Sequence, residues 1–498
     1  MDRIAIEKAI EELKERIGEH NVLTSMFERV PRAMAHCVFP IHKWREYIPD
    51  AVVTPESTED VVEVVKVANK YKIPIVPRSG GSGLSDGVVP LKRGIVVDLL
   101  KMNKILEIDL ENCTATVEAG VSLDELGREL LKYGYIYPDY PASRHSAFVC
   151  ARIATNGWSY ICGRYGHTED LVVGFEVVLP TGEIVQIRRG GGKIMKSSTG
   201  YNLKSLFFGS QGTLGIITKA TVEIFPAPEV ECPAYWGFKN FESAYKALGA
   251  LQKSGVACAG GWGLYDEKRV EFYRRDLPVY MDLPENFKVV VFWHLYGNED
   301  EVEVARKRLF RICENAGGTF LGKEFSENAW FGRHETSVPP IHGRKNGMVV
   351  PMVWVMEDPA VNYTEIPKLK ESWHRIIAKY GFDDWGLLFA SNRKSKQGEY
   401  LAGIMIGVDE TEFLENPKRW DEYVSCRREL MLVALDAGCS LSAAHGPVEE
   451  GKVELVKKEL GDEAFKLMLK IKKLLDPNNI MNPGKFMLDL AYGGDGIE

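Results

Sequence analysis

The spacing of apolar residues predicts helices and strands from near the start of the chain. Residues 5–20, AIEKAIEELKERIGEH, repeat apolar positions at helical spacing among Glu and Lys, which predicts an amphipathic helix with a solvated face. Farther on, AVVTP predicts a strand, and Ser57 followed by Glu59 and Asp60 predicts the start of a helix. The segment IPIVPR after that helix predicts a buried strand.

Short β-like runs and a second helix follow this unit. Residues 94–120 contain three such runs, and SLDELGRELLKYGY carries Ser122 and Glu125 at the spacing of a capping box. Later, VVLPTGEIV predicts a β-hairpin with its turn at residues 180–182. These patterns predict an α+β fold rather than a long series of βαβ units.

Length and proline positions divide the chain into domains. The 498 residues exceed what one hydrophobic core organises, and the prolines of FPAPEVECP, residues 225–233, mark a boundary. Eight of the ten tryptophans lie between residues 229 and 440, where we expect most in a core and a minority in a pocket wall. The predicted divisions are an N-terminal helical segment (1–46), a first domain (47–228), a second α+β domain (229–440) and a C-terminal segment (441–498).

Composition excludes several classes of protein. A net charge of −8 argues against a nucleic-acid-binding surface, and no apolar run approaches the roughly 20 residues that span a bilayer. The charged N-terminal helix is not a signal peptide, and the nine cysteines form no C-x-x-C pair. Scattered cysteines suit a reducing compartment, so we expect a cytoplasmic protein in which any redox chemistry uses an organic cofactor.

The segment VPRSGGSGLSDG, residues 76–87, is the first of three loops rich in Gly and Ser. A dinucleotide fingerprint requires a helix after the glycines, but here an extended run containing Pro90 follows. The loop is either an anion-binding nest of backbone N–H groups or a mobile surface loop. Because residues 151–185 and 196–225 are also dense in Gly, Ser and Thr between strands, we expect a long ligand held by backbone.

Seven ordered motifs carry a resemblance to a known flavoprotein superfamily. They are VPRSGGSGLSDG, GIVVDLLKMNKI, VEAGV, IATNG, YGHTEDLVVGFEVVLPTGEI, GYNLKSLFFGSQGTLGIIT and DPNNIMNPGKF. In these motifs the chain resembles the vanillyl-alcohol oxidase/p-cresol methylhydroxylase superfamily, and within it the glycolate oxidase/D-lactate dehydrogenase branch. The resemblance implies a two-part FAD-binding domain with an inserted α+β cap, the substrate domain, and a C-terminal segment that returns to the FAD domain.

The resemblance also assigns cofactor-binding residues. Ser82 stands where some relatives bond a histidine covalently to the flavin, so the resemblance implies non-covalent FAD. Cys150 and Ala151 replace a usual glycine pair, which implies a slightly shifted backbone in the second loop. The matched positions are Pro77, Arg78, Ser79, Gly80, Gly81, Ser82 and Gly83 in the first loop, Ser143, Thr155, Asn156 and Gly157 in the second, Gly212, Thr213 and Ile217 in the third, and Asn482 and Lys485 near the C-terminus.

Two residues are the candidates for catalysis. His445, in LSAAHGPVEEGK, falls where hydroxy-acid enzymes carry a Glu-His-Gly segment, and a histidine titrates near working pH. Arg333, in AWFGRHE, resembles the arginine with which relatives hold a substrate carboxylate. Lys485 is a second candidate cation near the flavin. The alternatives are a structural histidine and a surface arginine.

A metal site is not expected. The hydroxy-acid branch carries clustered histidines and a glutamate, but here Ala444 replaces the glutamate and His445 is the only histidine after His374. The region of the missing histidines instead contains a basic cluster, which either meets an anionic substrate or forms a solvated loop. The cluster consists of Arg393, Lys394 and Lys396.

These residues and the resemblance together imply an FAD-dependent oxidoreductase that oxidises an alcohol or a 2-hydroxy acid by hydride transfer to flavin N5. Its expected partners are a small-molecule substrate and an electron acceptor that stays open between oxygen, a quinone and an electron-transfer protein; a homo-oligomer is also left open. One alternative is a phenol oxidase or dehydrogenase of the vanillyl-alcohol type. Others are a transferase like alkyl-dihydroxyacetone-phosphate synthase and a non-catalytic flavoprotein subunit.

Overall fold

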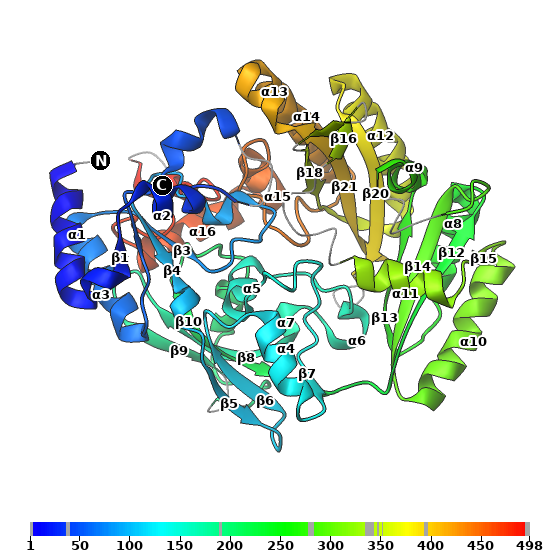
Figure 1. The fold of residues 1–498 in the computed structure, drawn as a ribbon, viewed down its shortest axis with the longest axis horizontal. Coiled ribbons are helices and arrows are strands. Elements are labelled where there is room, and N and C mark those ends of the chain that lie inside the picture. Colours follow the sequence, from blue (N-terminus) through cyan, green and yellow to red (C-terminus); the bar gives the residue numbers. More distant parts are fainter. Residues whose placement is uncertain are drawn as a thin grey trace.

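A small, partly parallel sheet begins the molecule. The computed structural model describes residues 3–35, 40–188, 192–276, 283–333, 343–345, 348–350, 352–392 and 397–493. Strands β2 and β3 both pair in parallel with β4 in a sheet of order β1-β2-β4-β3, and α1 packs against α3 beside it (Figure 1). The elements are α1 (Arg3–Ile17), β1 (Val22–Leu23), α2 (Met26–Arg29), β2 (Ala51–Val53), α3 (Thr58–Tyr71), β3 (Ile75–Arg78) and β4 (Ile95–Asp98).

An antiparallel sheet of order β5-β6-β10-β8-β9 follows. The predicted hairpin is confirmed, since β8 pairs with β9 in register from Gly174 opposite Arg188 to Val178 opposite Ile184. The elements here are β5 (Ile105–Asp109), β6 (Thr114–Glu118), α4 (Leu123–Leu131), β7 (Tyr135–Ile136), α5 (Val149–Thr155), α6 (Cys162–Tyr165), α7 (Thr168–Leu171), β8 (Val172–Val178), β9 (Ile184–Arg188), β10 (Ile216–Glu223) and β11 (Phe225–Pro226).

The predicted helix starts are also confirmed. Ser57 accepts a hydrogen bond from the backbone N–H of Asp60 at the start of α3, and Asp60 bonds back to the N–H of Ser57. Ser122 and Glu125 form the same reciprocal pair at the start of α4. Each pair satisfies backbone donors that the first turn of a helix leaves without an intrahelical acceptor.

A larger antiparallel sheet of order β15-β12-β14-β13-β20-β21-β18, with β19 paired to β21, forms the right half of Figure 1. Its elements are β12 (Val230–Phe238), α8 (Phe241–Leu251), β13 (Ala259–Tyr265), α9 (Glu267–Asp276), β14 (Val289–Gly297), α10 (Glu299–Asn315), β15 (Thr319–Phe320), α11 (Lys323–Gly332), β16 (Gly343–Lys345), β17 (Met348–Val350), β18 (Met352–Glu357), β19 (Ala360–Asn362), α12 (Ile366–Tyr380), β20 (Asp383–Ser391), β21 (Glu399–Asp409), α13 (Glu410–Glu415) and α14 (Pro417–Asp436).

The two faces of this sheet pack in two different hydrophobic cores. Alternate residues of a strand point to opposite faces. Trp236, Val291 and Phe389 pack in one cluster with residues of α8, α10, α12 and α14. Tyr235 and Phe292, their strand neighbours, pack instead in a cluster shared with the two N-terminal sheets. The second face of the large sheet therefore faces the first half of the chain.

The C-terminal segment returns to the first sheet. Helices α15 (Val456–Leu460) and α16 (Asp462–Leu475) precede a stretch that runs beside β3. The N–H of Ile75 donates to the carbonyl of Ile480 at 2.7 Å, and the N–H of Asn482 donates to the carbonyl of Ile75 at 2.8 Å. This pairing brings residues 480–482 next to the strand from which the glycine loop starts.

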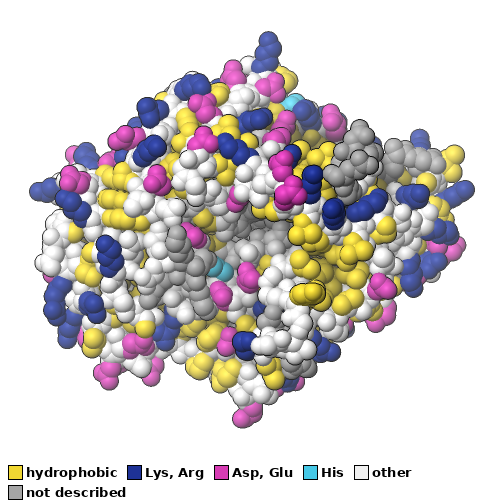
Figure 2. Space-filling model, turned by 180° about the vertical axis from the view of Figure 1, so that it is seen from behind, with side chains coloured by type: hydrophobic (Ala, Val, Ile, Leu, Met, Phe, Trp, Pro, Cys, Tyr) yellow, Lys and Arg dark blue, Asp and Glu magenta, His cyan; other side chains and the backbone are white. Residues whose placement is uncertain are grey.

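The surface carries charges of both signs. Lys and Arg are spread among Asp and Glu over the face seen in Figure 2, which is hollowed near its middle. In the part of the chain that the structure describes, no helix is both long and apolar enough to cross a membrane. The basic cluster Arg393, Lys394 and Lys396 lies outside the described residues.

Candidate active site

A cavity of about 2010 Å³, counting the solvent at its mouth, lies between the glycine-rich loops and the large sheet. Its walls combine loops of the first half of the chain with α9, β20 and β21 of the second half. The described lining contains four arginines and no carboxylate, and it also contains a histidine. These residues are Arg78, Arg152, Arg269, Arg333 and His445. The cavity is therefore suited to an anionic occupant.

The first glycine loop lines one end of the cavity. All seven matched residues from position 77 to position 83 are in the wall. Gly81 has a φ of +66°, which favours glycine, and a Cβ on Gly80 would lie 2.3 Å from the carbonyl oxygen of Ser146. A Cβ on Gly83 would meet nothing within 4 Å. The loop thus presents bare backbone to the cavity, as a phosphate-binding nest requires.

The second and third loops complete this end. Ser143, Thr155, Gly212 and Ile217 line the cavity as expected. Asn156 and Gly157 are outside the lining, because Asn156 ends α5 in a left-handed conformation with a φ of +49° and Gly157 packs against the Arg152 guanidinium. Thr213 is also behind the wall, where its hydroxyl donates to the carbonyl of Ser210 at 2.7 Å and its own carbonyl accepts from Lys472 at 2.9 Å.

Asn482 and Lys485 stand behind the loops rather than in the cavity wall. The Asn482 amide donates to the carbonyls of Gly87 at 2.8 Å and Gln211 at 2.6 Å, so it joins the first loop to the third. The buried Lys485 ammonium donates to the carbonyls of Asp86 and Val89. These two contacts hold the back of the glycine loop, and the expected role of Lys485 as a cation beside the flavin stays a prediction.

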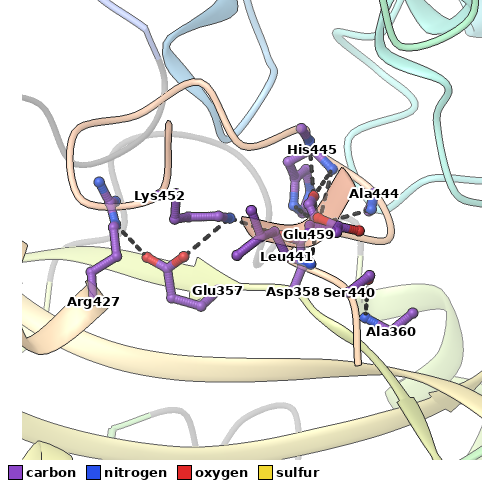
Figure 3. Close-up of polar contacts among 12 residues, drawn as sticks. Glu357, Asp358, Ala360, Arg427, Ser440, Leu441, Ala444, His445, Lys452 and Glu459 are labelled. Atoms are coloured by element: carbon purple, nitrogen blue, oxygen red, sulfur yellow. Dashed lines mark hydrogen bonds and ion pairs between the residues drawn. The ribbon is translucent and has the colours of Figure 1, made fainter. Parts of the chain in front are cut away.

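His445 lines the cavity and is held by a buried carboxylate. Its Nδ1 lies 3.0 Å from Oδ2 of Asp358, and the His445 side chain is 19% exposed (Figure 3). The same Asp358 oxygen accepts hydrogen bonds from the Ser442 hydroxyl at 2.8 Å and from the backbone N–H groups of Ala444 and His445. Gln211 donates to the carbonyl of His445 at 3.0 Å from the third loop. These contacts fix the imidazole in the wall.

A buried group of charges extends behind Asp358. Lys452 lies 3.2 Å from Asp358 and 3.1 Å from Glu357, and Arg427 pairs with Glu357 at 2.7 Å (Figure 3). Burial alone raises the pKa of the Asp358 carboxyl, but Lys452 and His445 hold the pKa below its ordinary value. Burial raises the pKa of Glu449, beside this group, to about 7. Asp358 therefore stays ionised behind His445.

Arg333 lines the end of the cavity formed by the large sheet. Its guanidinium carbon lies 3.3 Å from the ring centroid of Trp330 and 5.6 Å from that of Tyr160, and Nη1 donates to the carbonyl of Trp330. Burial lowers the pKa of Arg333. Arg333 therefore lies in the cavity wall, and its expected role in binding an anion stays a prediction.

Several wall residues were not predicted from the sequence. Arg269, Tyr273 and Trp385 line the cavity, and Tyr160 joins them from the first half of the chain. Arg269 lies in DEKRVEFYRRD, whose dense charges are typical of a solvated helix. Asp358, behind the wall, was also not predicted, because the acidic pair in VMEDP does not identify the distant His445 as its partner. In the described part of the chain, no group of His, Cys, Asp or Glu side chains is placed to hold a metal ion.

The residues present fit FAD. The glycine loop offers backbone donors, Arg78 lies against Gly81, and the described lining has no carboxylate to repel a diphosphate. Burial lowers the pKa of Arg78 to about 10, which leaves its guanidinium charged at neutral pH.

Family models and known proteins match both halves of the chain. Residues 49–188 match the family model described as FAD binding domain, and residues 227–486 match the model described as FAD linked oxidases, C-terminal domain. The chain is 29% identical to glycolate oxidase subunit GlcD of Bacillus subtilis over 441 residues, 88% of this chain and 89% of that protein. It is 28% identical to D-lactate dehydrogenase of Anaerostipes hadrus over 468 residues, 89% of this chain and 90% of that protein.

The fold matches a solved structure over nearly its whole length. The structure of p-cresol methylhydroxylase with substrate bound superposes with a TM-score of 0.80 at 23% identity, covering 98% of this chain and 97% of that one. The α+β architecture expected from the sequence, a two-part FAD-binding domain with an inserted cap, is confirmed. The cofactor is FAD, and the chain belongs to the family of FAD-linked oxidases and is an FAD-dependent oxidoreductase.

Proposed function

We propose that this protein oxidises the CH–OH group of an alcohol or 2-hydroxy acid, with His445 as the base. The observation that carries the proposal is one cavity that holds the glycine loop, Arg333 and the His445 ring, with the ring backed by Asp358. Oxidation of an alcohol needs a group that takes the hydroxyl proton and a hydride acceptor beside the same carbon. The cavity supplies the proton acceptor, His445, and has room for the hydride acceptor.

The burial of Nδ1 beside Asp358 decides which nitrogen of His445 acts. Nδ1 lies 3.0 Å from the carboxylate but is not aligned for a hydrogen bond with it, so in this proposal Nε2 accepts the substrate's hydroxyl proton. When the ring takes that proton, the ionised Asp358 stabilises the resulting imidazolium. Asp358 is thus a positioning residue, because it acts on the substrate only through His445.

Arg333 supplies the anion contact in this proposal. A planar guanidinium pairs with a carboxylate through two parallel hydrogen bonds, and the Trp330 ring beneath Arg333 fixes its plane. Bound FAD supplies the hydride acceptor, and the residues that would hold it are the first loop at 77–83 with Ser143, Thr155, Gly212 and Ile217. In this proposal the loops bind FAD, Arg333 binds the substrate anion and His445 takes the proton.

The test is anaerobic reduction of the purified protein by a panel of 2-hydroxy acids, sugar alcohols and phenolic alcohols. The absorbance of the flavin reports its reduction. The proposal expects rapid loss of absorbance with at least one alcohol or hydroxy acid. Reduction by phenols alone would contradict it.

Reduction by phenols alone would favour a phenol-oxidising enzyme, and one observation supports this second candidate function. Arg269 donates to the Tyr273 hydroxyl at 2.9 Å, and Tyr160 lines the same end of the cavity. Hydroxyl and guanidinium donors of this kind can hold a phenolate oxygen. The panel separates the two functions because aliphatic hydroxy acids and sugar alcohols lack the phenol ring.

A further inference from the structure

The end of the cavity formed by the large sheet contains two arginines. Of the remaining cavity arginines, Arg152 is paired with Asp139 at 2.6 Å and Arg78 lies at the glycine loop. Arg269 and Arg333 face the other end, where the described lining offers aromatic and aliphatic side chains but no carboxylate. A buried guanidinium in apolar surroundings is costly unless an anion or several acceptors meet it.

Two donors of Arg269 meet no acceptor among the described residues. Nη2 donates to the Tyr273 hydroxyl at 2.9 Å, whereas the buried Nε and Nη1 have no hydrogen-bond partner among the residues that the structure describes. The residue is only 9% exposed and lines the cavity. Two unsatisfied charged donors in a cavity wall indicate that a ligand supplies the acceptors.

The position of Arg269 is fixed by its surroundings. Its guanidinium carbon lies 4.5 Å from the ring centroid of Tyr273 and 5.1 Å from that of Phe272. Its backbone N–H donates to Asp266 at 3.0 Å, and a Cβ on Gly386 would lie 1.9 Å from that nitrogen. The fork is therefore preorganised, which is what bidentate recognition of a carboxylate requires.

The walls around the two arginines are apolar and broad. Phe272 stacks on Trp385 with ring centroids 4.4 Å apart, and aliphatic side chains continue the surface. The apolar lining residues at this end are Tyr265, Met356, Leu388, Leu401 and Met405. Glycolate or lactate has almost no apolar surface to bury against such walls, whereas an aromatic or branched substituent would cover them.

We propose that Arg269 is a second carboxylate-binding residue and that the substrate is a 2-hydroxy acid with a bulky apolar substituent. This inference rests on the proposed function and specifies the substrate class of that site. The carboxylate lies between Arg269 and Arg333, and the substituent packs against Phe272 and Trp385.

The first experiment measures binding without turnover. Phenylacetate, acetate and phenylacetamide are titrated into the FAD-loaded protein by calorimetry. Phenylacetate is expected to bind roughly tenfold to hundredfold more tightly than either the small acid or the neutral amide, because only it meets both features of the site. Equal affinity for phenylacetate and phenylacetamide would overturn the carboxylate role, and equal affinity for phenylacetate and acetate would overturn the apolar one.

Variants assign the effect to Arg269. Arg269→Gln is expected to weaken phenylacetate binding by at least about tenfold and to leave phenylacetamide binding unchanged, with Arg306→Gln on the outer helix α10 as the control. If Arg269→Gln loses FAD, Arg269→Lys retains the charge but not the fork, and is expected to retain only part of the affinity. Unchanged phenylacetate affinity in both variants would overturn the assignment.

Turnover separates this inference from the function on which it rests. Anaerobic flavin reduction by 3-phenyllactate is expected to be faster than reduction by lactate at equal concentration. Equal rates for both acids would overturn the inference and leave the proposed function intact. Reduction by neither acid nor any other alcohol would overturn the proposed function, and this substrate class with it.

Discussion

Nδ1 of His445 lies 3.0 Å from Oδ2 of Asp358, although the two residues lie 87 positions apart in the chain. The carboxylate also accepts two backbone N–H groups from the loop that carries the histidine, so loop and ring are held together. The proposed chemistry depends on this pair.

Asp358→Asn removes the charge that stabilises the His445 imidazolium while it keeps the side chain's shape. We expect the flavin to remain bound and the rate of flavin reduction to fall on the order of 10²-fold. We also expect the pH profile of that rate to move, which a packing role alone would not produce. Stopped-flow reduction across pH, with Asp436→Asn on the exposed Asp436–Lys458 pair as control, makes the comparison. An unmoved profile at full rate would exclude Asp358 from the mechanism.

Lys485→Met should loosen the glycine loop. The substitution leaves the carbonyls of Asp86 and Val89 without their buried donor, which costs on the order of 1–3 kcal/mol for each unsatisfied group. We expect lower FAD occupancy, measured as the ratio of flavin to protein absorbance, and weaker rebinding of FAD to stripped protein. Lys470→Met, at an exposed position of α16, serves as the matched control. Full occupancy in Lys485→Met would show that the loop does not need this lysine.

His374 should make stability depend on alkaline pH. It lies between Asp266 at 2.7 Å and Asp384 at 2.6 Å, and although burial alone lowers the pKa of His374, the two carboxylates raise it from 6.5 to about 9. The stabilisation is thus complete below pH 6.5 and lost as pH rises through about 9.

We therefore expect His374→Gln to lower the melting temperature strongly at pH 6 and much less near pH 10, while the exposed control His20→Gln lowers it little at either pH. Thermal unfolding scans at the two pH values decide the point. The same decrease at both pH values would contradict the ion-pair account.

Glu449 should also stabilise the fold more at low pH than at high pH, but over a lower pH range than His374. Burial raises the pKa of this carboxyl from 4.5 to about 7, so the folded state holds the proton more tightly than the unfolded state. The contribution of the protonated Glu449 to the free energy of unfolding is complete below pH 4.5 and is lost as pH rises through about 7. This loss is about 3 kcal/mol at most. Glu449→Gln mimics the protonated form. Its melting temperature relative to wild type should rise between pH 5 and pH 8, and Glu415→Gln, at an exposed position, should show no such trend.

Local features of the fold were predictable from the sequence because neighbouring residues determine them. Ser57 with Asp60, Ser122 with Glu125 and the hairpin at residues 177–185 depend only on contacts within a few positions. The glycine loop was recognisable for the same reason, and the order of the motifs along the chain indicated the flavoprotein family. The domain boundaries at residues 46, 228 and 440 stay predictions.

The rest of the site could not be predicted because it is assembled across the chain. Asp358 meets His445 only after β18 and the loop at 440–452 are brought together, and no local pattern marks that pair. Arg269 lies in a segment as charged as any surface helix, so only the packing of α9 against β20 identifies it as buried. Lys485 was expected near the flavin from its motif, but its contacts with the carbonyls of Asp86 and Val89 join residues far apart in the chain, which no local pattern shows.

The central claim is that His445 takes the substrate's hydroxyl proton, and the most direct measurement is anaerobic stopped-flow flavin reduction in wild type and His445→Gln. The substrate is whichever alcohol or hydroxy acid reduces the wild-type protein. The account predicts that the variant retains FAD and binds substrate, while its reduction rate falls by roughly 10²-fold or more. Reduction of the flavin in His445→Gln at the wild-type rate would contradict it.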